Sequence, residues 1–205
     1  MHPARAFHEA DPAVLASRVA ERGFAVIVGT GEGRPVVAHA PVLLDEGRLR
    51  FHLSAANPLG KALQGSGWGL AVITGADTYV SPDWYELPDQ VPTWNYLSVE
   101  IEGPVRALER RAATALLEDL SARYEADLAP KPPWTRAKLD PAKFETLLSG
   151  IVAFEMTVER LEGITKLSQN KPPEAVQRVA RYLVDIPDAG ASVIAAHMLR
   201  PRASE

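Results

Sequence analysis

The chain has 205 residues, a formal net charge of -4 from 22 basic and 26 acidic residues, and no cysteine. This length suits one domain or two small ones and allows a self-sufficient hydrophobic core. The absence of cysteine excludes disulfides, thiolate metal sites, iron–sulfur clusters and a cysteine nucleophile. The mildly acidic balance excludes a broadly basic surface for nucleic acid.

The first half of the chain predicts one helix followed by an antiparallel meander. Residues 11–23 begin with Asp and Pro, carry apolar residues on one side and end in Gly, which is typical of a capped amphipathic helix. Runs rich in β-branched residues follow at 24–28, 34–44 and 48–53. The segments GTGEG and DEG between them favour hairpin turns.

The second half mixes strands and helices. The further expected strands cover 68–74, 95–109 and 151–161, and the further expected helices begin near residues 57, 110, 140, 172 and 190. Six strands with short connections predict an α+β, mainly β fold, a six-stranded antiparallel split barrel with flanking helices. We expect residues 1–163 to form this barrel domain and residues 164–205 to form a C-terminal loop and helical appendage.

No targeting signal is visible in the sequence. The start, MHPARAFHEADPAV, lacks an apolar core of signal-peptide length, and no apolar run approaches the ~20 residues of a membrane span. We therefore expect a cytoplasmic protein with no membrane partner.

The window from Tyr79 to Tyr96 is rich in aromatic residues and proline. It holds five of the chain's fourteen aromatic residues and three prolines, a composition that favours an ordered loop. Two interpretations stay open: a ligand wall or subunit interface, which we favour, and a loop that seals one end of the barrel.

Polar residues at three places in the chain are candidates for binding a ligand. Ser54, Asn57 and Lys61 lie where a strand ends and a short helix begins, which suits a phosphate, although a routine helix start explains them as well. His39 lies mid-strand, where it either contacts a ligand or bonds to the backbone. The run from Lys166 to Lys171 suits an anionic ligand, but a solvated loop is the simpler interpretation. The five histidines lack metal-ligand spacing, so we expect no metal site.

The motifs YVSPDWYE, VPTWNY, the NPxxK unit and KLSQNK occur in the order found in the PaiB-type FMN-binding negative transcriptional regulators. The chain resembles this family, which belongs to the FMN-binding split-barrel superfamily, from about residue 7 to residue 183. The resemblance implies a six-stranded split barrel, a homodimer with FMN in a groove between subunits, and a role in transcriptional regulation.

The resemblance also assigns cofactor-binding residues in the first half of the chain. It makes Ser54, Asn57 and Lys61 the cradle for the FMN phosphate and places His39 along the isoalloxazine ring. No site for a substrate phosphate is visible, so we do not expect oxidation of pyridoxamine phosphate.

Further along the chain, the resemblance implies that Trp94 and Asn95 reach the flavin across the dimer interface. It also implies that Lys166 and Ser168 close the site from the C-terminal side. No catalytic residue is assigned.

Alternatives to a regulatory flavoprotein stay open at the level of sequence. An FMN-dependent oxidoreductase is one, because the flavin itself carries the chemistry; a split barrel with a vestigial groove is another. Residues 160–202 hold seven basic and four acidic residues, a local balance of 7 - 4 = +3. This C-terminal stretch predicts at most a weak, salt-dependent contact with DNA.

Overall fold

The computed structural model describes residues 2–64 and 67–200. These residues form two compact units. The barrel unit comprises residues 16–73 and 100–161, and the helical unit comprises the described parts of 1–15, 74–99 and 162–205. Two long strands, β5 (Gly67–Val80) and β6 (Thr93–Ala107), contribute residues to both units.

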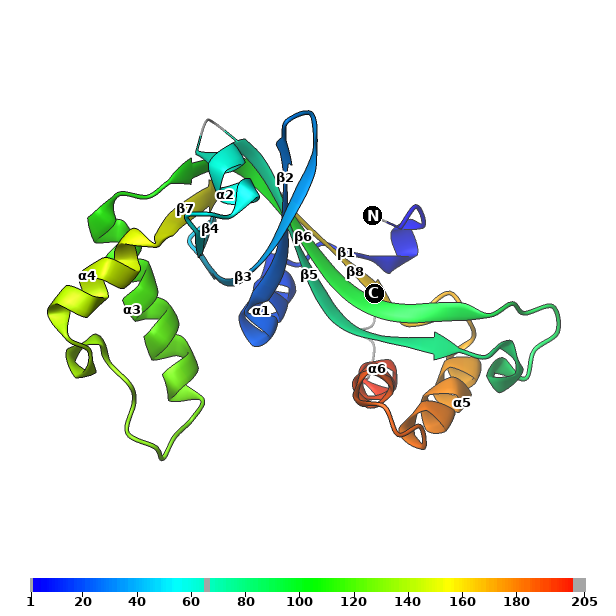
Figure 1. Cartoon of the computed structure of the whole chain (residues 1–205). Helices are drawn as coiled ribbons and strands as arrows, with labels where there is room; N and C mark the ends of the chain where they lie inside the picture. Colours follow the sequence, from blue (N-terminus) through cyan, green and yellow to red (C-terminus); the bar gives the residue numbers. More distant parts are fainter. Residues whose placement is uncertain (1, 65–66, 201–205) are drawn as a thin grey trace. The chain divides into compact units, whose positions relative to one another are not determined.

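The barrel unit is built on six strands. Besides the segments of β5 and β6, these are β2 (Phe24–Gly31), β3 (Arg34–Asp45), β4 (Arg48–Ser54) and β7 (Ile151–Thr157). Hydrogen bonds join neighbours in the order β6-β5-β2-β3-β4-β7, and β7 also pairs with β6 (Figure 1). The pairings of β2, β3, β4 and β7 are antiparallel, which confirms the fold predicted from the sequence.

Alternation along these strands places the apolar side chains in one core. In β4, Leu49, Phe51 and Leu53 are buried while the residues between them are more exposed, as the two-residue period of a strand requires. Phe51 lies directly opposite Phe154 of β7, and their rings stack with centroids 5.4 Å apart. Cross-strand aromatic pairs of this kind fix the register of a sheet.

Helices cover one part of the barrel unit. The helices α3 (Arg110–Ala126) and α4 (Pro141–Ser149) lie beside β7 (Figure 1), and α2 (Pro58–Leu63) follows β4. The helices α2 and α4 both begin where the sequence predicts, with Asn57 capping α2 by accepting a hydrogen bond from Leu59 N and Asp140 capping α4 by accepting one from Lys143 N. A shared apolar cluster joins α3, α4 and β7; its buried members are Ala113, Leu116, Leu120, Phe144, Leu148 and Ala153.

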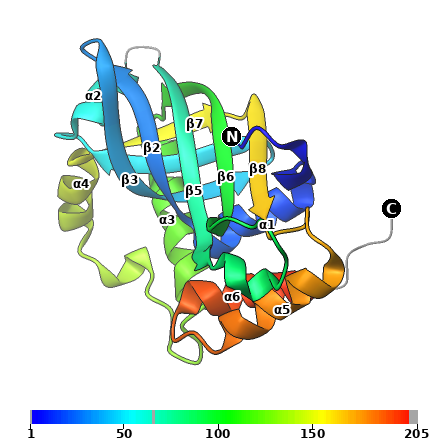
Figure 2. The ribbon, with the colours of Figure 1, turned by 90° about the vertical axis from the view of Figure 1, so that its right-hand side faces the viewer.

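The helical unit gathers the last two helices around one core. Its elements, apart from β5 and β6, are η1 (Arg5–Phe7), β1 (His8–Glu9), η2 (Pro82–Tyr85), β8 (Arg160–Lys166), α5 (Pro173–Val184) and α6 (Ala189–Leu199), and α1 (Pro12–Arg22) begins in it. The helices α5 and α6 lie side by side (Figures 1 and 2). Their apolar faces pack with Val80, Tyr85 and Leu97.

The largest departures from the predicted elements are in two strands. The single strand expected over 151–161 is two strands, because the chain turns at residues 158–159, where Val158 N donates to Gly47 O and Glu159 N donates to Glu102 O. The strand β5 continues to Val80, beyond the expected end at residue 74. Polar residues interrupt the pattern in both places, and only pairing with distant strands decides where each strand ends.

None of the helices in the described parts of the chain combines the length and hydrophobicity that a bilayer crossing requires.

A close backbone approach at Gly103 gives a stability prediction. A Cβ atom at this position of β6 would lie 1.9 Å from the carbonyl oxygen of Thr157, so Gly103→Ala forces the backbones apart. We expect this variant to lose about 3 kcal/mol or more of unfolding free energy, measured by urea denaturation. Gly33→Asn, at an open turn with a φ of 74°, is the control. If the two variants have equal unfolding free energies, β6 and the end of β7 can move apart at Gly103 without a loss of stability, and the prediction is wrong.

Candidate functional site

Three of the predicted site residues lie on one continuous turn of the barrel unit. Ser54 ends β4, Asn57 caps α2 and Lys61 lies within α2. Backbone hydrogen bonds run from Asn57 N to Ser54 O at 2.9 Å and from Lys61 N to Asn57 O at 3.2 Å. The structure therefore brings these three residues together through local hydrogen bonding, as the sequence indicated.

The chemistry of this turn fits a phosphate group. Ser54 and Lys61 are exposed, and neither an ion pair nor a hydrogen bond occupies the Lys61 ammonium among the described residues. The Asn57 side-chain oxygen is used in the cap, at 2.9 Å from Leu59 N, so its amide hydrogens stay free to donate. A hydroxyl, an amide and an ammonium group are donors that suit the oxygens of a phosphate.

His39 lies on the outer face of β3, away from this turn in sequence. Its ring is exposed and stacks on Phe24 of β2, with centroids 6.4 Å apart and planes 21° apart. It is opposite Val26, which in turn is opposite Val72 of β5. His39 is thus the polar member of an otherwise apolar strand surface.

That surface, which we call the outer strip, runs across β2, β3 and β5. It leaves large apolar side chains uncovered: Trp68 is 53% exposed and Val37 is 50% exposed. Its members are Phe24, Val26, Val28, Val37, His39, Trp68, Leu70 and Val72. Exposed apolar patches of this kind mark interaction sites.

The helical unit buries the other predicted pair, Asn95 and Ser168. Asn95 is fully buried in β6 and Ser168 is 3% exposed. The Asn95 amide donates to Ser168 Oγ at 3.0 Å, and Ser168 Oγ also lies 2.6 Å from the Tyr85 hydroxyl. The resemblance implied that Asn95 contacts a flavin; in the structure its amide donates within a buried trio of Asn95, Ser168 and Tyr85.

Burial changes the proton affinity of groups around the trio. It raises the pKa of Tyr85, and the hydrogen bond with Ser168 opposes that rise. It lowers the pKa of Lys166, whose ammonium donates to Thr93 Oγ1 at 2.8 Å and lies 5.7 Å from the centroid of the Phe7 ring. Lys166 therefore lies half-buried over an aromatic face, with its charge less favoured than that of a solvated lysine.

Trp94 and Asn95, which the resemblance places together at the flavin, point to opposite faces of β6. Because successive residues of a strand face opposite sides, Asn95 is buried while Trp94 is 54% exposed. The Trp94 ring meets Tyr79 edge to face, with centroids 6.2 Å apart. The pair forms an exposed aromatic surface.

Tyr85 is a member of the site that the sequence did not single out. Arg178 of α5 donates to the Tyr85 carbonyl oxygen at 2.6 and 3.1 Å, and Trp84 stacks on Tyr182 with centroids 5.7 Å apart. The aromatic composition of residues 79–96 was the available signal. Within that window, two rings pack on α5 and two others, Tyr79 and Trp94, stay exposed.

Among residues 2–64 and 67–200, no three His, Asp or Glu side chains gather in a way that could hold a metal ion.

Comparisons with known proteins show which family the chain belongs to and which proteins are similar to it. A family model described as "Putative FMN-binding domain" matches residues 1–160. The chain is 31% identical over 157 residues to "Protease synthase and sporulation protein PAI 2" of Bacillus subtilis (strain 168), a match covering 75% of this chain and 74% of that protein. It is 30% identical over 168 residues to the uncharacterized protein AN0679 of Emericella nidulans, covering 66% and 67% respectively.

Solved structures share the fold. The FAD and heme binding protein from Mycobacterium smegmatis aligns with a TM-score of 0.61 at 16% identity, over 82% of this chain and 78% of that chain. The flavocytochrome Anf3 from Azotobacter vinelandii aligns with a TM-score of 0.60 at 14% identity, over 80% and 72%. At these identities the likeness concerns the fold alone.

The buried trio gives a prediction about stability. Ser168→Ala leaves the Tyr85 hydroxyl and the Asn95 amide without their shared partner, so we expect a loss of about 3 kcal/mol of unfolding free energy in urea. Ser192→Ala is the matched control, because this exposed serine of α6 bonds only to Asp188 O within its own helix; a change within about 0.5 kcal/mol is expected there. If both variants unfold alike, the trio contributes nothing to stability.

Proposed function

The chain belongs to the FMN-binding domain family, and from this premise we propose that it is a homodimeric FMN-binding protein with a regulatory role of the PaiB type. The family match over residues 1–160 carries the proposal, since it covers the turn of Ser54, Asn57 and Lys61 and the strand that holds Trp94. The relationship to the Bacillus subtilis protein supports the regulatory part, because that protein is named for protease synthesis and sporulation.

The barrel unit supplies the phosphate cradle in this proposal. Lys61 neutralises charge on the FMN phosphate, while the Ser54 hydroxyl and the Asn57 amide donate hydrogen bonds to its oxygens. The cap formed by Asn57 fixes the turn before the ligand arrives, which limits the entropy lost on binding. Bound FMN supplies hydride- and electron-transfer chemistry.

The helical unit offers two exposed or half-exposed groups as flavin contacts. The Trp94 ring provides an apolar face, and the Lys166 ammonium provides a donor whose lowered pKa reflects its burial. Asn95 and Ser168 are positioning residues in this proposal, because their polar atoms already bond to each other within the buried trio. They hold the segment that carries Lys166.

The outer strip is the surface on which we place a second copy of the chain. Its exposed tryptophan, valines and phenylalanine cost free energy in water, and pairing with an identical strip would remove them from it. His39, at its edge, would then lie at the subunit interface beside the flavin ring. A homodimer built this way matches the aromatic and apolar composition of interface cores.

Direct contact with DNA is a minor part of the proposal. Four of the six basic residues that the structure describes in the C-terminal stretch are engaged within the chain: Arg160 pairs with Glu102, Lys166 bonds to Thr93, Lys171 bonds to Gln90, and Arg178 bonds to the Tyr85 carbonyl. Few cations are left to neutralise phosphates, so DNA binding would be weak and steeply salt-dependent. We place the protein in the cytoplasm.

Removal of the cradle cation tests the cofactor site. We expect Lys61→Ala to weaken FMN binding about 10- to 100-fold, because a charged hydrogen bond contributes about 1.5–3 kcal/mol. Quenching of flavin fluorescence on titration measures the dissociation constant. Lys138→Ala, in which an exposed lysine outside the cradle is removed, should bind FMN as the parent does. Unchanged affinity in Lys61→Ala would place the phosphate elsewhere.

A charge on the outer strip tests the homodimer. We expect the parent protein to sediment as a dimer and Val37→Glu to sediment as a monomer, because the carboxylate would be buried unpaired in the interface. Val91→Glu is the matched control, since Val91 is 74% exposed on the loop between β5 and β6. A parent protein that stays monomeric at micromolar concentration, or a dimeric Val37→Glu, would rule out the outer strip as the interface.

A further inference from the structure

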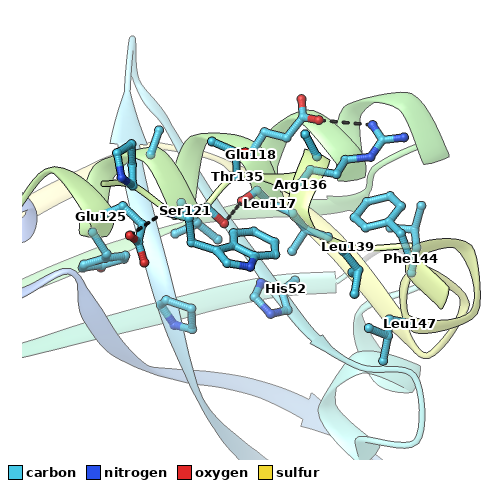
Figure 3. Close-up of a pocket in the computed structure, with 18 of the residues that line it drawn as sticks. His52, Leu117, Glu118, Ser121, Glu125, Thr135, Arg136, Leu139, Phe144 and Leu147 are labelled. Atoms are coloured by element: carbon cyan, nitrogen blue, oxygen red, sulfur yellow. Dashed lines mark hydrogen bonds and ion pairs between the residues drawn. The ribbon is translucent and has the colours of Figure 1, made fainter. Parts of the chain in front are cut away.

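The barrel unit contains a large cavity that the proposed flavin site does not use. It has a volume of about 1190 Å³ and lies between α3, α4, the segment 133–139 and the outer faces of β3 and β4 (Figure 3). Small-molecule sites are typically about 300–1,000 Å³, so the space accepts a ligand of two or more rings.

Apolar and aromatic side chains form most of the walls of this cavity. Leu117 and Leu120 of α3 and Phe144 and Leu147 of α4 line it, and Trp134 lies on the connecting segment. Trp134 is 39% exposed and Leu147 is 55% exposed, so the walls stay in contact with solvent. A ligand with a flat apolar body would remove this surface from water.

His52 lines the cavity from β4, with a nitrogen that is unsatisfied. Its Nδ1 atom is buried and has no hydrogen-bond partner among the described residues, and burial lowers the pKa of the ring. Burial thus favours the neutral imidazole, in which one ring nitrogen donates a hydrogen bond and the other accepts one. Buried polar atoms without partners are rare in proteins, so a hydrogen bond from a ligand to this ring would be favourable.

The charged residues that line the cavity leave one cation unpaired. Glu118 pairs with Arg136 at 3.1 Å, and Glu125 pairs with Lys131, so both carboxylates are neutralised. Lys143, exposed on α4, has no ion-pair partner in the described part of the chain. The spare charge at the wall of the cavity is positive.

We propose that this cavity binds an amphipathic organic anion, with an aromatic or otherwise flat apolar body inside and an acidic group at Lys143. The apolar walls accommodate the body, the neutral ring of His52 offers one polar contact, and Lys143 neutralises the acid. The ligand is a second one, bound independently of FMN, because the lining residues include neither Ser54 nor Asn57 nor Lys61.

Two fluorescent probes that differ by one acidic group test this proposal. These are 1-anilinonaphthalene-8-sulfonate and its neutral parent N-phenyl-1-naphthylamine, each titrated into the full-length protein. Lys143→Gln should weaken the sulfonate about 2- to 5-fold, the effect of one exposed ion pair, and leave the neutral probe unchanged. Arg181→Gln, which removes an exposed cation of α5 that does not line the cavity, is the matched control and should alter neither probe.

A cavity-filling substitution locates the probes. Ser121 lines the cavity and its hydroxyl bonds only to Leu117 O of the same helix, so Ser121→Trp places an indole in the space where the probes bind and should weaken both probes about 10-fold. Ser192→Trp places the same indole on an exposed position of α6 and should change neither. Probe bound at the outer strip is insensitive to all four substitutions, so only cavity binding produces the expected pattern.

Any one of three results would overturn the proposal. The first is that Ser121→Trp binds each probe with the same affinity as the parent protein, and the second is that Lys143→Gln leaves the ratio of the two probe affinities unchanged. The third is that FMN displaces the sulfonate stoichiometrically in equilibrium dialysis. Because Lys143 is exposed, its variant stays informative even where Ser121→Trp fails to fold. We expect both Lys143→Gln and Ser121→Trp to bind FMN as the parent protein does, so that a failure of this proposal can be told apart from a failure of the FMN phosphate site at Lys61.

Discussion

The double pairing of β7 is the constraint on which the barrel unit depends. It bonds to β4 along its whole length, from Arg48 opposite Thr157 to Ser54 opposite Ile151, and its C-terminal part also bonds to β6. The circuit of strands closes only if β6 and β7 come into close contact, and Gly103 permits this because a side chain there would collide with Thr157. The pairing of β6 with β7 therefore also fixes the positions of the residues on the outer faces of β4 and β7, among them His52 and Ser54.

Alternation along β4 distributes the two proposed binding functions. His52 and Ser54 lie on the same face of the strand, two residues or roughly 7 Å apart, while Leu53 between them points into the core. One polar residue lines the apolar cavity and the other opens the phosphate cradle. A flavin phosphate and a second anionic ligand can therefore occupy neighbouring positions on one strand without sharing a side chain.

The helical unit uses polar groups for a different purpose. Asn95, Ser168 and Tyr85 satisfy one another in a buried place where an unpaired donor would be costly, and Ser168 holds a left-handed backbone with a φ of 58°. This arrangement fixes the segment after β8, from which Lys166 extends over Phe7. The polar run from Lys166 to Lys171 suggested a ligand site in the sequence, and one of its residues, Ser168, forms hydrogen bonds that stabilise the fold.

The sequence by itself determined the features that depend on neighbouring residues. Strand and helix periodicity follows from the geometry of the local backbone, and the helix starts near Asn57 and Asp140 and the turn that joins Ser54 to Lys61 follow from hydrogen bonds spanning a few residues. Each of these was predicted. Only the tertiary structure decided the end of β7 at Thr157, the meeting of Tyr85 with Ser168, and the cavity between β4, α3 and α4. These depend on contacts between residues far apart in the chain, which side-chain packing selects and local periodicity does not encode.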